Sequence, residues 1–517
     1  MPVGELAARD WDAIVVGGGH NGLVAAAYLA KAGRSVLVLE RREQLGGACT
    51  IERPFADERY LVSPCAYVVG LLDELVISEL GLREYGYQVT PCDPHLWCGF
   101  ADGSSYADFA DPARTAAYLR DNGFAESDIA GLDAYYALVG RARAALRHGS
   151  RDSWVGPSPT RAELEAMLGD EELIGLVFED SVADVIRRYV DDPRLHQALW
   201  GQGVIGTDAG PETPGTAGVK LMHSQGTLDG VGGSWGYVKG GMGTVSFAIA
   251  DAAAAAGATI ATGVPVGRVL PGEGVELEGG ELIRARTVIS NADPKRLRSL
   301  LPEAEVPAAF AERLDGWKVD SPVGKLNAGL TRMPTFSAAP EGFDPTKAMV
   351  TCSIPLAEAQ DAWEGARVPD GEVRIGFAEL YFHTAYDPTV APEGRQTMSV
   401  FAEYIPIDSS GAGETVAEPG ALMNGILDAI EAHAPDIRDC VEYCDVLGPA
   451  DIEERIGLTG GHIFQGSVLP EQMWEHRFPS RTPIDGLYMC GAATHPGGSV
   501  IGLNGRNAAI AAIEDLG

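Results

Sequence analysis

The chain opens with two apolar runs separated by a helical stretch. Residues 14–16 and 36–39 are short and rich in β-branched side chains, a pattern typical of strands buried on both faces of a parallel sheet. Residues 23–32, between them, have the composition of a helix. The pattern predicts a β-α-β unit at the start of the chain.

Helical periodicity dominates residues 71–228. Helices are predicted at 132–146 and 173–190, and Thr160 with Glu163 forms a capping box that begins another helix. This part of the chain predicts a helical cap.

The second half of the chain alternates again between strands and helices. The pattern predicts a helix at 245–256, short strands at 258–261, 264–270, 275–277 and 288–290, mixed strands and turns over 302–449, a last strand at 485–491 and a last helix at 507–516. This order returns the chain to its first sheet and places both ends in one domain.

The predicted fold class is α/β, with a discontinuous Rossmann-like dinucleotide-binding domain, a mixed α+β substrate domain and a helical cap region. The dinucleotide-binding segments are residues 1–70, 229–300 and 451–517. The helical cap is predicted at 71–228 and the substrate domain at 301–450.

Three glycines after the first strand have Gly-x-Gly-x-x-Gly spacing. Gly17 permits a sharp turn, Gly19 lets the backbone approach a pyrophosphate, and Gly22 lets the helix pack against the strand. Glu40 ends the second strand, where a carboxylate accepts hydrogen bonds from a ribose diol. The spacing predicts an adenine dinucleotide, and the charge of Glu40 disfavours a 2′-phosphate.

Composition excludes several classes of function. The 517 residues carry 73 acidic and 39 basic side chains, a net charge of −34, which repels nucleic acid. Eight cysteines lie scattered without a Cys-x-x-Cys pair or zinc spacing, so we predict reduced thiols and no metal. Cys440 and Cys444 fall on a stretch predicted to be helical. One dinucleotide motif and no redox cysteine pair argue against a disulfide reductase.

No segment of the sequence has the pattern of a signal peptide or a membrane span. We therefore expect a cytoplasmic protein without a transmembrane segment. Peripheral contact with a membrane stays open.

Several motifs together resemble the phytoene-desaturase-like flavoproteins of the amine-oxidase superfamily. They are the first glycine motif, residues 240–243, residues 290–293 and the closing stretch 487–506. The likeness covers nearly the whole chain and is greatest to the pyridine-nucleotide-disulphide-oxidoreductase-domain-containing protein 2 group. The resemblance implies that the dinucleotide is FAD.

The resemblance also implies which residues contact FAD. Gly46 and Gly47 match a second glycine signature, and the closing glycine segment matches the one that brings backbone to the flavin. The implied cofactor-binding residues are Gly17, Gly19, His20, Asn21, Gly22, Glu40, Arg41, Gly46, Gly47, Ala48, Val266, Gly491, Gly498, Val500 and Ile501.

Two residues are candidates for catalysis. Lys325 lies in a strand-like segment and is similar in placement to the amine-oxidase lysine that holds a water against flavin N5; the alternative is a surface lysine on an edge strand. His462 is the second candidate, although the family pattern has asparagine there and histidine where this chain has Gln465. His495 is a candidate for the pocket wall or for a structural role.

The resulting hypothesis is an FAD-dependent oxidoreductase that dehydrogenates, desaturates or oxygenates a bulky, largely apolar small molecule, with hydride passing to flavin N5. Dioxygen or another acceptor would take the electrons. The alternatives are a flavin amine oxidase, against which stands the lack of an evident aromatic pair, and an FAD-binding scaffold without turnover.

Overall fold

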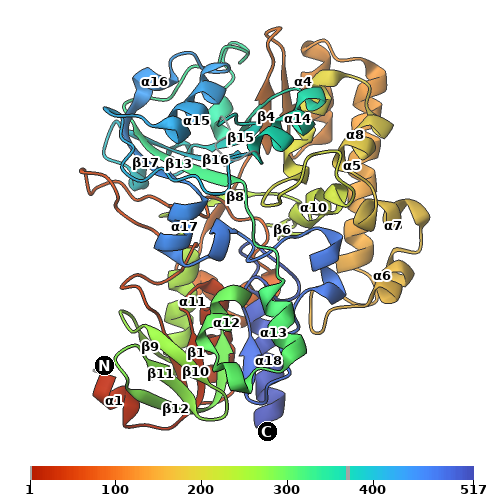
Figure 1. Ribbon diagram of the computed structural model, residues 1–517. Helices are drawn as coiled ribbons and strands as arrows, with labels where there is room; N and C mark the ends of the chain where they lie inside the picture. Colours follow the sequence, from red (N-terminus) through yellow and green to blue (C-terminus); the bar gives the residue numbers. More distant parts are fainter. Residues whose placement is uncertain (1–2, 368–372) are drawn as a thin grey trace.

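The computed structural model describes residues 3–367 and 373–517. Its first sheet lies at the end of the molecule that also holds both chain termini (Figure 1). The strand order is β10-β11-β12-β1-β2-β9, and β18 pairs with β12. The bounds are β1 Trp11–Val16, β2 Val36–Leu39, β9 Thr259–Ala261, β10 Val266–Leu270, β11 Gly274–Leu277, β12 Leu282–Ser290 and β18 Leu487–Met489. Because these strands come from the start, middle and end of the chain, the prediction of a discontinuous Rossmann-like domain is confirmed.

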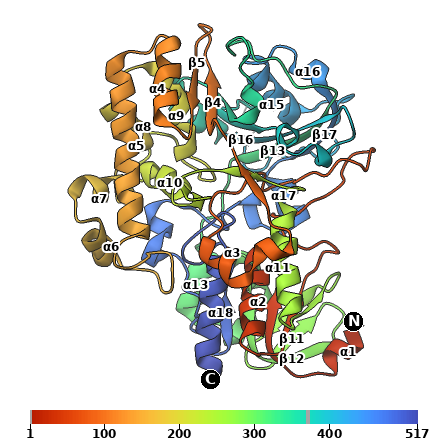
Figure 2. The same cartoon turned by 180° about the vertical axis from the view of Figure 1, so that it is seen from behind.

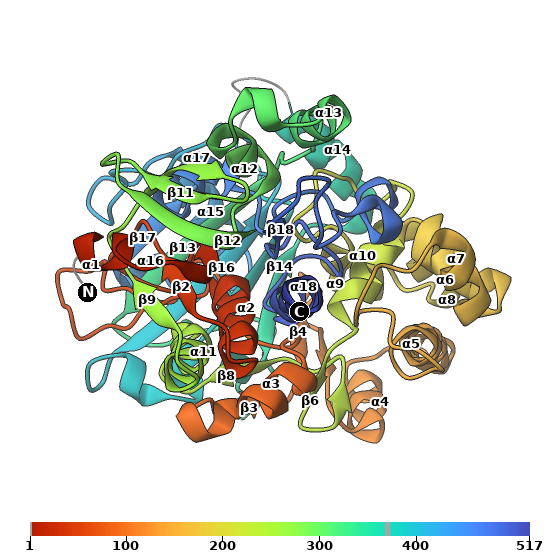
Figure 3. The ribbon, with the colours of Figure 1, turned by 90° about the horizontal axis from the view of Figure 1, so that it is seen from below.

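Alternate residues of the central strands enter different cores. Val15 and Val38 pack with α2, whereas Ile14 and Leu37 face the core on the other side of the sheet. Helices α2 and α18 pack against each other on one face (Figure 3). The helices of this domain are α1 Val3–Ala7, α2 His20–Lys31, α3 Glu74–Leu80, α11 Gly243–Ala255, α12 Pro294–Leu300, α13 Ala308–Asp315 and α18 Leu503–Leu516.

The second sheet lies at the other end of the molecule and has the order β17-β13-β16-β15-β14-β4-β5 (Figures 1 and 2). Its strands are mostly antiparallel, and β4 pairs with β14 in parallel. The bounds are β4 Leu96–Gly99, β5 Ser105–Asp108, β13 Val323–Leu330, β14 Met349–Ser353, β15 Phe377–Tyr381, β16 Gln396–Glu403 and β17 Val441–Leu447, with helices α14 Leu356–Ala366, α15 Ala421–Glu431, α16 Ile437–Cys440 and α17 Pro449–Ile456.

Two sequence predictions need correction here. Strands β4 and β5 interrupt the region 71–228 that was predicted to be helical, because β4 finds its partner in β14, far along the chain. Cys440 ends α16 but Cys444 lies in β17, so the two do not share a helix. All eight cysteines lie in the described part of the chain and are free thiols.

The helical cap lies beside the second sheet, with the long helix α5 along its outer side (Figure 2). Thr160 and Glu163 form the predicted capping box at the start of α6. The cap helices are α4 Pro112–Asp121, α5 Glu126–Arg147, α6 Arg161–Leu168, α7 Glu171–Phe178, α8 Val182–Tyr189, α9 Pro193–Leu199 and α10 Thr216–His223; short strand pairs are β3 Val89–Pro91 with β8 Gly236–Val238 and β6 Thr227–Leu228 with β7 Val231–Gly232. Among the described residues, none of the helices is long and apolar enough to cross a bilayer.

Candidate functional site

A cavity of about 550 Å³ connects the two sheets. It begins at Val16 and Leu39, at the carboxyl ends of β1 and β2, and reaches Lys325 and Glu379 on the second sheet. The carboxyl edge of a parallel sheet is where ligands bind in open α/β folds. The cavity therefore joins a nucleotide-binding edge to residues of the second sheet.

The glycine motif shapes the nucleotide end of this cavity. Gly17 has a φ of +101°, a conformation that few other residues adopt. A Cβ on Gly22 would lie 2.2 Å from the carbonyl oxygen of Gly17, so only glycine lets α2 approach β1 this closely. Gly19 lines the cavity, and a Cβ there would lie 2.7 Å from Nδ2 of Asn291.

The N-terminus of α2 presents unsatisfied groups to the cavity. No side chain caps this helix, so its first N–H groups are free to donate. Among the described residues, the buried atoms Nε2 of His20 and Oδ1 of Asn21 have no hydrogen-bond partner. Both residues line the cavity, and burial lowers the pKa of His20 to about 4, so its ring is neutral at pH 7. A helix N-terminus with open donors fits a diphosphate.

Glu40 lies at the end of β2 with its carboxylate fixed by backbone. Its Oε2 accepts a hydrogen bond from Gly18 N at 2.7 Å, and Oε1 accepts one from Arg42 N at 2.9 Å. Glu40 lines the cavity, as does the exposed Arg41, whose guanidinium donates to backbone carbonyls of α17. The carboxylate retains acceptor capacity for a ribose.

The second glycine pair lies against the first. Gly46 N donates to Gly18 O at 2.9 Å, and a Cβ on Gly46, whose φ is +108°, would lie 2.3 Å from the carbonyl oxygen of Cys49. Gly47 and Ala48 follow it along the cavity wall. This loop brings backbone to the middle of the cavity.

The cavity brings together most of the residues predicted to contact FAD. Those that line it are Gly17, Gly19, His20, Asn21, Glu40, Arg41, Gly46, Gly47, Ala48, Val266 and Val500. Those that do not are Gly22, Gly491, Gly498 and Ile501.

Gly491 and Gly498, in the closing segment, pack against residues that line the cavity. A Cβ on Gly491 would lie 2.3 Å from Oε1 of Gln465, and one on Gly498 would lie 2.2 Å from Cβ of Phe464. Gln465 and Phe464 line the cavity. These glycines therefore let the closing segment pack directly behind the wall.

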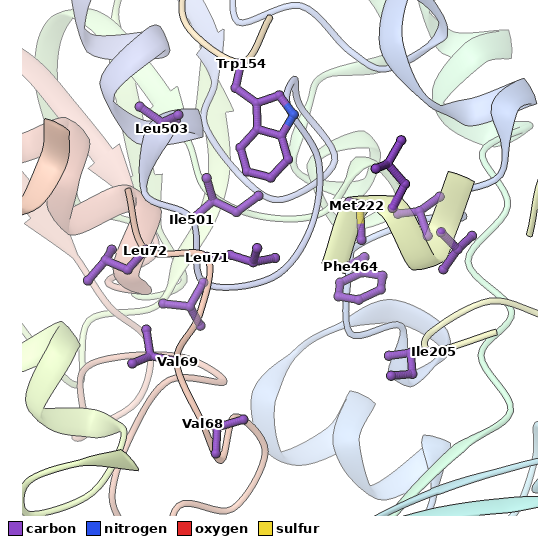
Figure 4. Close-up of a cluster of buried hydrophobic side chains, with 14 of the residues drawn as sticks. Val68, Val69, Leu71, Leu72, Trp154, Ile205, Met222, Phe464, Ile501 and Leu503 are labelled. Atoms are coloured by element: carbon purple, nitrogen blue, oxygen red, sulfur yellow. The ribbon is translucent and has the colours of Figure 1, made fainter. Parts of the chain in front are cut away.

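An apolar cluster joins the closing segment to the cap (Figure 4). Ile501 is fully buried in it, and Phe464 and Ile205 belong both to the cluster and to the cavity wall. Met222, on α10, belongs to the same cluster. One continuous core thus supports the cavity from three separate parts of the chain.

Lys325 lies in the interior of the second sheet. Strand β13 pairs with β16 and β17, so it is not an edge strand, and Lys325 is only 2% exposed. Its Nζ donates to Ser399 Oγ at 2.7 Å and lies 4.0 Å from the centre of the Tyr67 ring. Burial lowers the pKa of Lys325 to about 7. The placement on a strand is confirmed, and the surface alternative is wrong.

A buried polar pair on β15 was missed by the sequence analysis. Glu379 and Tyr381 line the cavity, and the Tyr381 hydroxyl donates to Glu379 Oε2. Gln202 Nε2 donates to Glu379 Oε1 at 3.2 Å. The sequence feature that could have identified Glu379 is an acidic residue within the apolar run 377–382, the same kind of feature that identified Lys325. No feature of the neighbouring sequence identifies Gln202.

The predicted catalytic histidine lies outside the cavity wall. His462 is fully buried, and its Nδ1 accepts a hydrogen bond from Phe464 N at 3.2 Å. Burial and the nearby charge of Arg477 lower the pKa of His462 to about 3. His495 is also outside the wall, with Nε2 2.8 Å from Ser153 O. Neither residue lines the cavity, and in the described part of the chain Nε2 of His462 and Nδ1 of His495 have no hydrogen-bond partner.

Another histidine does line the cavity. His223, on α10, has Nδ1 2.9 Å from Val219 O, so this nitrogen donates and Nε2 is left as an acceptor. Its ring lies beside Phe464 and Trp235, which also line the cavity, and burial lowers its pKa to about 4. Among residues 3–367 and 373–517, no group of three or more His, Cys, Asp or Glu side chains forms a metal site.

Fold and site together define a flavin-dependent oxidoreductase of the amine-oxidase superfamily. Residues 15–68 match the family model of the NAD(P)-binding Rossmann-like domain, and residues 119–373 match flavin containing amine oxidoreductase. An engineered putrescine oxidase structure has a TM-score of 0.61 at 18% identity, covering 98% of this chain and 99% of that one.

Sequence relatives define the family more closely. The rat (Rattus norvegicus) pyridine nucleotide-disulfide oxidoreductase domain-containing protein 2 is 33% identical over 98% of this chain and 94% of its own length. Phytoene desaturase (lycopene-forming) of Pantoea ananas is 24% identical over 97% of this chain and 99% of its own. The chain belongs to the pyridine nucleotide-disulfide oxidoreductase domain-containing protein 2 family.

These findings confirm FAD as the cofactor, and the residues of the site fit it. The uncapped N-terminus of α2, with its free N–H donors, suits the diphosphate, and Glu40 suits the adenosine ribose. When bound, FAD supplies two-electron redox chemistry.

Proposed function

We propose that this protein is an FAD-dependent oxidoreductase that dehydrogenates, desaturates or oxygenates a bulky, largely apolar small molecule, with hydride passing to flavin N5. The observation that carries the proposal is the continuous cavity from the dinucleotide cradle to the second sheet. Its far part is walled mainly by apolar side chains, among them Val68, Ile205, Trp235, Met349 and Phe401. Such walls bind apolar ligands by removing their surface from water. The phytoene desaturase relative also supports an apolar substrate.

Lys325 is the proposed catalytic residue. Its amine is held by Ser399, whose Oγ donates in turn to Asn327 Oδ1 at 2.9 Å. Asn327 Nδ2 donates to Pro64 O, so the chain of hydrogen bonds ends on backbone. We propose that this fixed amine holds a water at the flavin edge, and that its charge assists electron transfer to dioxygen or another acceptor.

His462 has no part in the proposed chemistry. Its ring is fully buried, accepts a hydrogen bond from Phe464 N and is not part of the cavity wall. We assign it a structural role.

The amine oxidase alternative finds less support at the same site. Tyr67 and Tyr381 do form an aromatic pair in the cavity wall, but their rings stack on each other with centroids 4.1 Å apart. Rings in mutual contact leave no space for an amine between them. This geometry favours an apolar substrate over an amine held between two aromatic rings.

We also propose a cytoplasmic location. The eight free cysteines support it, because cytosolic thiols stay reduced. Apolar substrates partition into membranes, so transient peripheral contact with a lipid surface is compatible with the proposal.

Anaerobic stopped-flow spectroscopy tests the function. Small molecules that co-purify with the protein are identified by mass spectrometry and mixed with the holoprotein without oxygen. We expect at least one apolar compound to bleach the flavin absorbance. Bleaching by alkylamines alone would establish the amine oxidase alternative, and no bleaching by any co-purified compound or carotenoid precursor would favour a scaffold.

A further inference from the structure

The far end of the cavity holds a carboxylate that the proposed redox chemistry does not use. Glu379 is 2% exposed and lines the cavity, and in the described part of the chain it accepts hydrogen bonds from Tyr381 and Gln202. A carboxylate has about four lone-pair sites, so two remain. Burial raises the pKa of Glu379, because a buried carboxylate is costly unless hydrogen-bond donors compensate it.

The charges around this carboxylate restrict what it can bind. Lys220 Nζ donates to Gln202 Oε1 behind the cavity wall, and Asp108 acts electrostatically on Lys220. Lys220 also acts electrostatically on Glu379, so a positive charge already lies near this carboxylate. Because this positive charge offsets that of the carboxylate, a further cation or anion would be buried without compensation.

A neutral hydrogen-bond donor remains as the group that fits. We infer that Glu379 accepts a hydrogen bond from a hydroxyl group on an otherwise apolar substrate, with Tyr381 and Gln202 holding the carboxylate in place. The substrate class is therefore an apolar alcohol rather than a pure hydrocarbon. This inference rests on the proposed function, since it names the substrate of the same cavity.

The stacked tyrosines provide the rigidity that such recognition needs. Tyr381 follows Glu379 on the same face of β15, and its ring packs on Tyr67 at 4.1 Å. Tyr67 in turn lies under Lys325 Nζ. The Tyr67 side chain thus contacts both Tyr381, at the proposed hydroxyl site, and Lys325, the proposed catalytic residue.

Binding to the holoprotein tests the inference without turnover. The probes are 1-octanol, octyl methyl ether, octane and octylamine, and the readouts are the change in flavin absorbance and titration calorimetry. The ether keeps the oxygen but cannot donate. We expect the alcohol to bind about tenfold more tightly than the ether or the alkane, the size of effect that a hydrogen bond to a charged group produces.

Variants locate the effect. In Glu379→Leu we expect the alcohol to bind less than about threefold more tightly than the ether, while FAD content stays unchanged. Glu379→Gln keeps the shape of the side chain and is used if Glu379→Leu does not fold. In this variant the ratio of alcohol affinity to ether affinity should decrease at least about threefold. The control is Glu403→Gln. Glu403 is a fully buried acid on the neighbouring strand that accepts from Gly206 N at 2.7 Å and does not line the cavity. It should keep the full preference.

Four results would overturn the inference: equal binding of alcohol and ether, tightest binding of octylamine, no binding of any probe, or an unchanged preference in the Glu379 variants. Failure of the proposed function is distinguishable, since the alcohol preference would then persist in a protein whose flavin no candidate substrate reduces.

Discussion

The Nζ atom of Lys325 lies 4.0 Å from the centre of the Tyr67 ring, and Tyr67 stacks on Tyr381 at 4.1 Å. A cation over an aromatic face is attracted by the negative charge density of the ring. This contact offsets part of the cost of burying the amine and fixes it at the cavity wall. The residues belong to three segments that are far apart in the sequence.

Replacing Gly19 should remove the cofactor. In Gly19→Val the side chain would point toward Asn291 and into the phosphate end of the cavity. We expect less than about a tenth of the wild-type flavin per chain, since a loss of only 1.4 kcal/mol already lowers affinity tenfold. The ratio of flavin absorbance to protein absorbance measures the flavin content per chain.

Gly140→Ala, in an open part of α5, is the control and should bind FAD normally. Full flavin content in Gly19→Val would mean that the pyrophosphate lies elsewhere.

The bound flavin should not be reduced directly by a pyridine nucleotide. FAD fills the dinucleotide site formed by the glycine motif and Glu40, and the second sheet carries no comparable motif in the described residues. Stopped-flow mixing with NADH or NADPH measures the reduction. Rapid reduction that saturates at micromolar nucleotide would falsify this prediction.

Lys325→Met should slow flavin reoxidation without loss of FAD. The methionine keeps most of the aliphatic stem but removes the amine and its bond to Ser399. We expect the rate constant of flavin reoxidation to decrease about tenfold or more, equivalent to roughly 1.4 kcal/mol of transition-state stabilisation. Rapid mixing of the reduced protein with oxygenated buffer measures this rate constant. Wild-type rates in the variant would leave Lys325 with a structural role only.

The same residue predicts a pH dependence of the rate. The pKa of Lys325 is lowered to about 7, so the amine is charged below this pH and neutral above it. If the charge assists reoxidation, the wild-type rate falls as pH rises through about 7. The Lys325→Met variant should lack this step, and a wild-type profile that is flat between pH 6 and 8.5 would contradict the role of the charge.

Stability should depend on pH in the opposite sense. Between pH 7 and about 10.5 the unfolded chain binds a proton at Lys325 that the folded protein does not, so the free energy of unfolding rises with pH in this range. The gain relative to Lys325→Met is at most roughly 5 kcal/mol. Urea unfolding of both apoproteins at several pH values isolates this contribution. Parallel curves for the two proteins would show that Lys325 titrates normally.

The sequence alone determined the nucleotide-binding half of this protein. Gly17, Gly19, Gly22 and Glu40 lie within one β-α-β unit, where local spacing fixes their relative positions. The motif, the helix and the two strands are therefore visible as a pattern. The buried Lys325 was recognisable for a similar reason, because a charge within an apolar run needs a partner.

Only the tertiary structure decided the other half of the site. Glu379 and Gln202 come together because β15 and the cap meet across the cavity, a contact between positions 177 residues apart. His462 lies only two residues from Phe464, yet one ring is sealed in the core and the other lines the cavity. Sequence spacing does not predict which side chains face the cavity and which face the core, because packing between distant segments determines this.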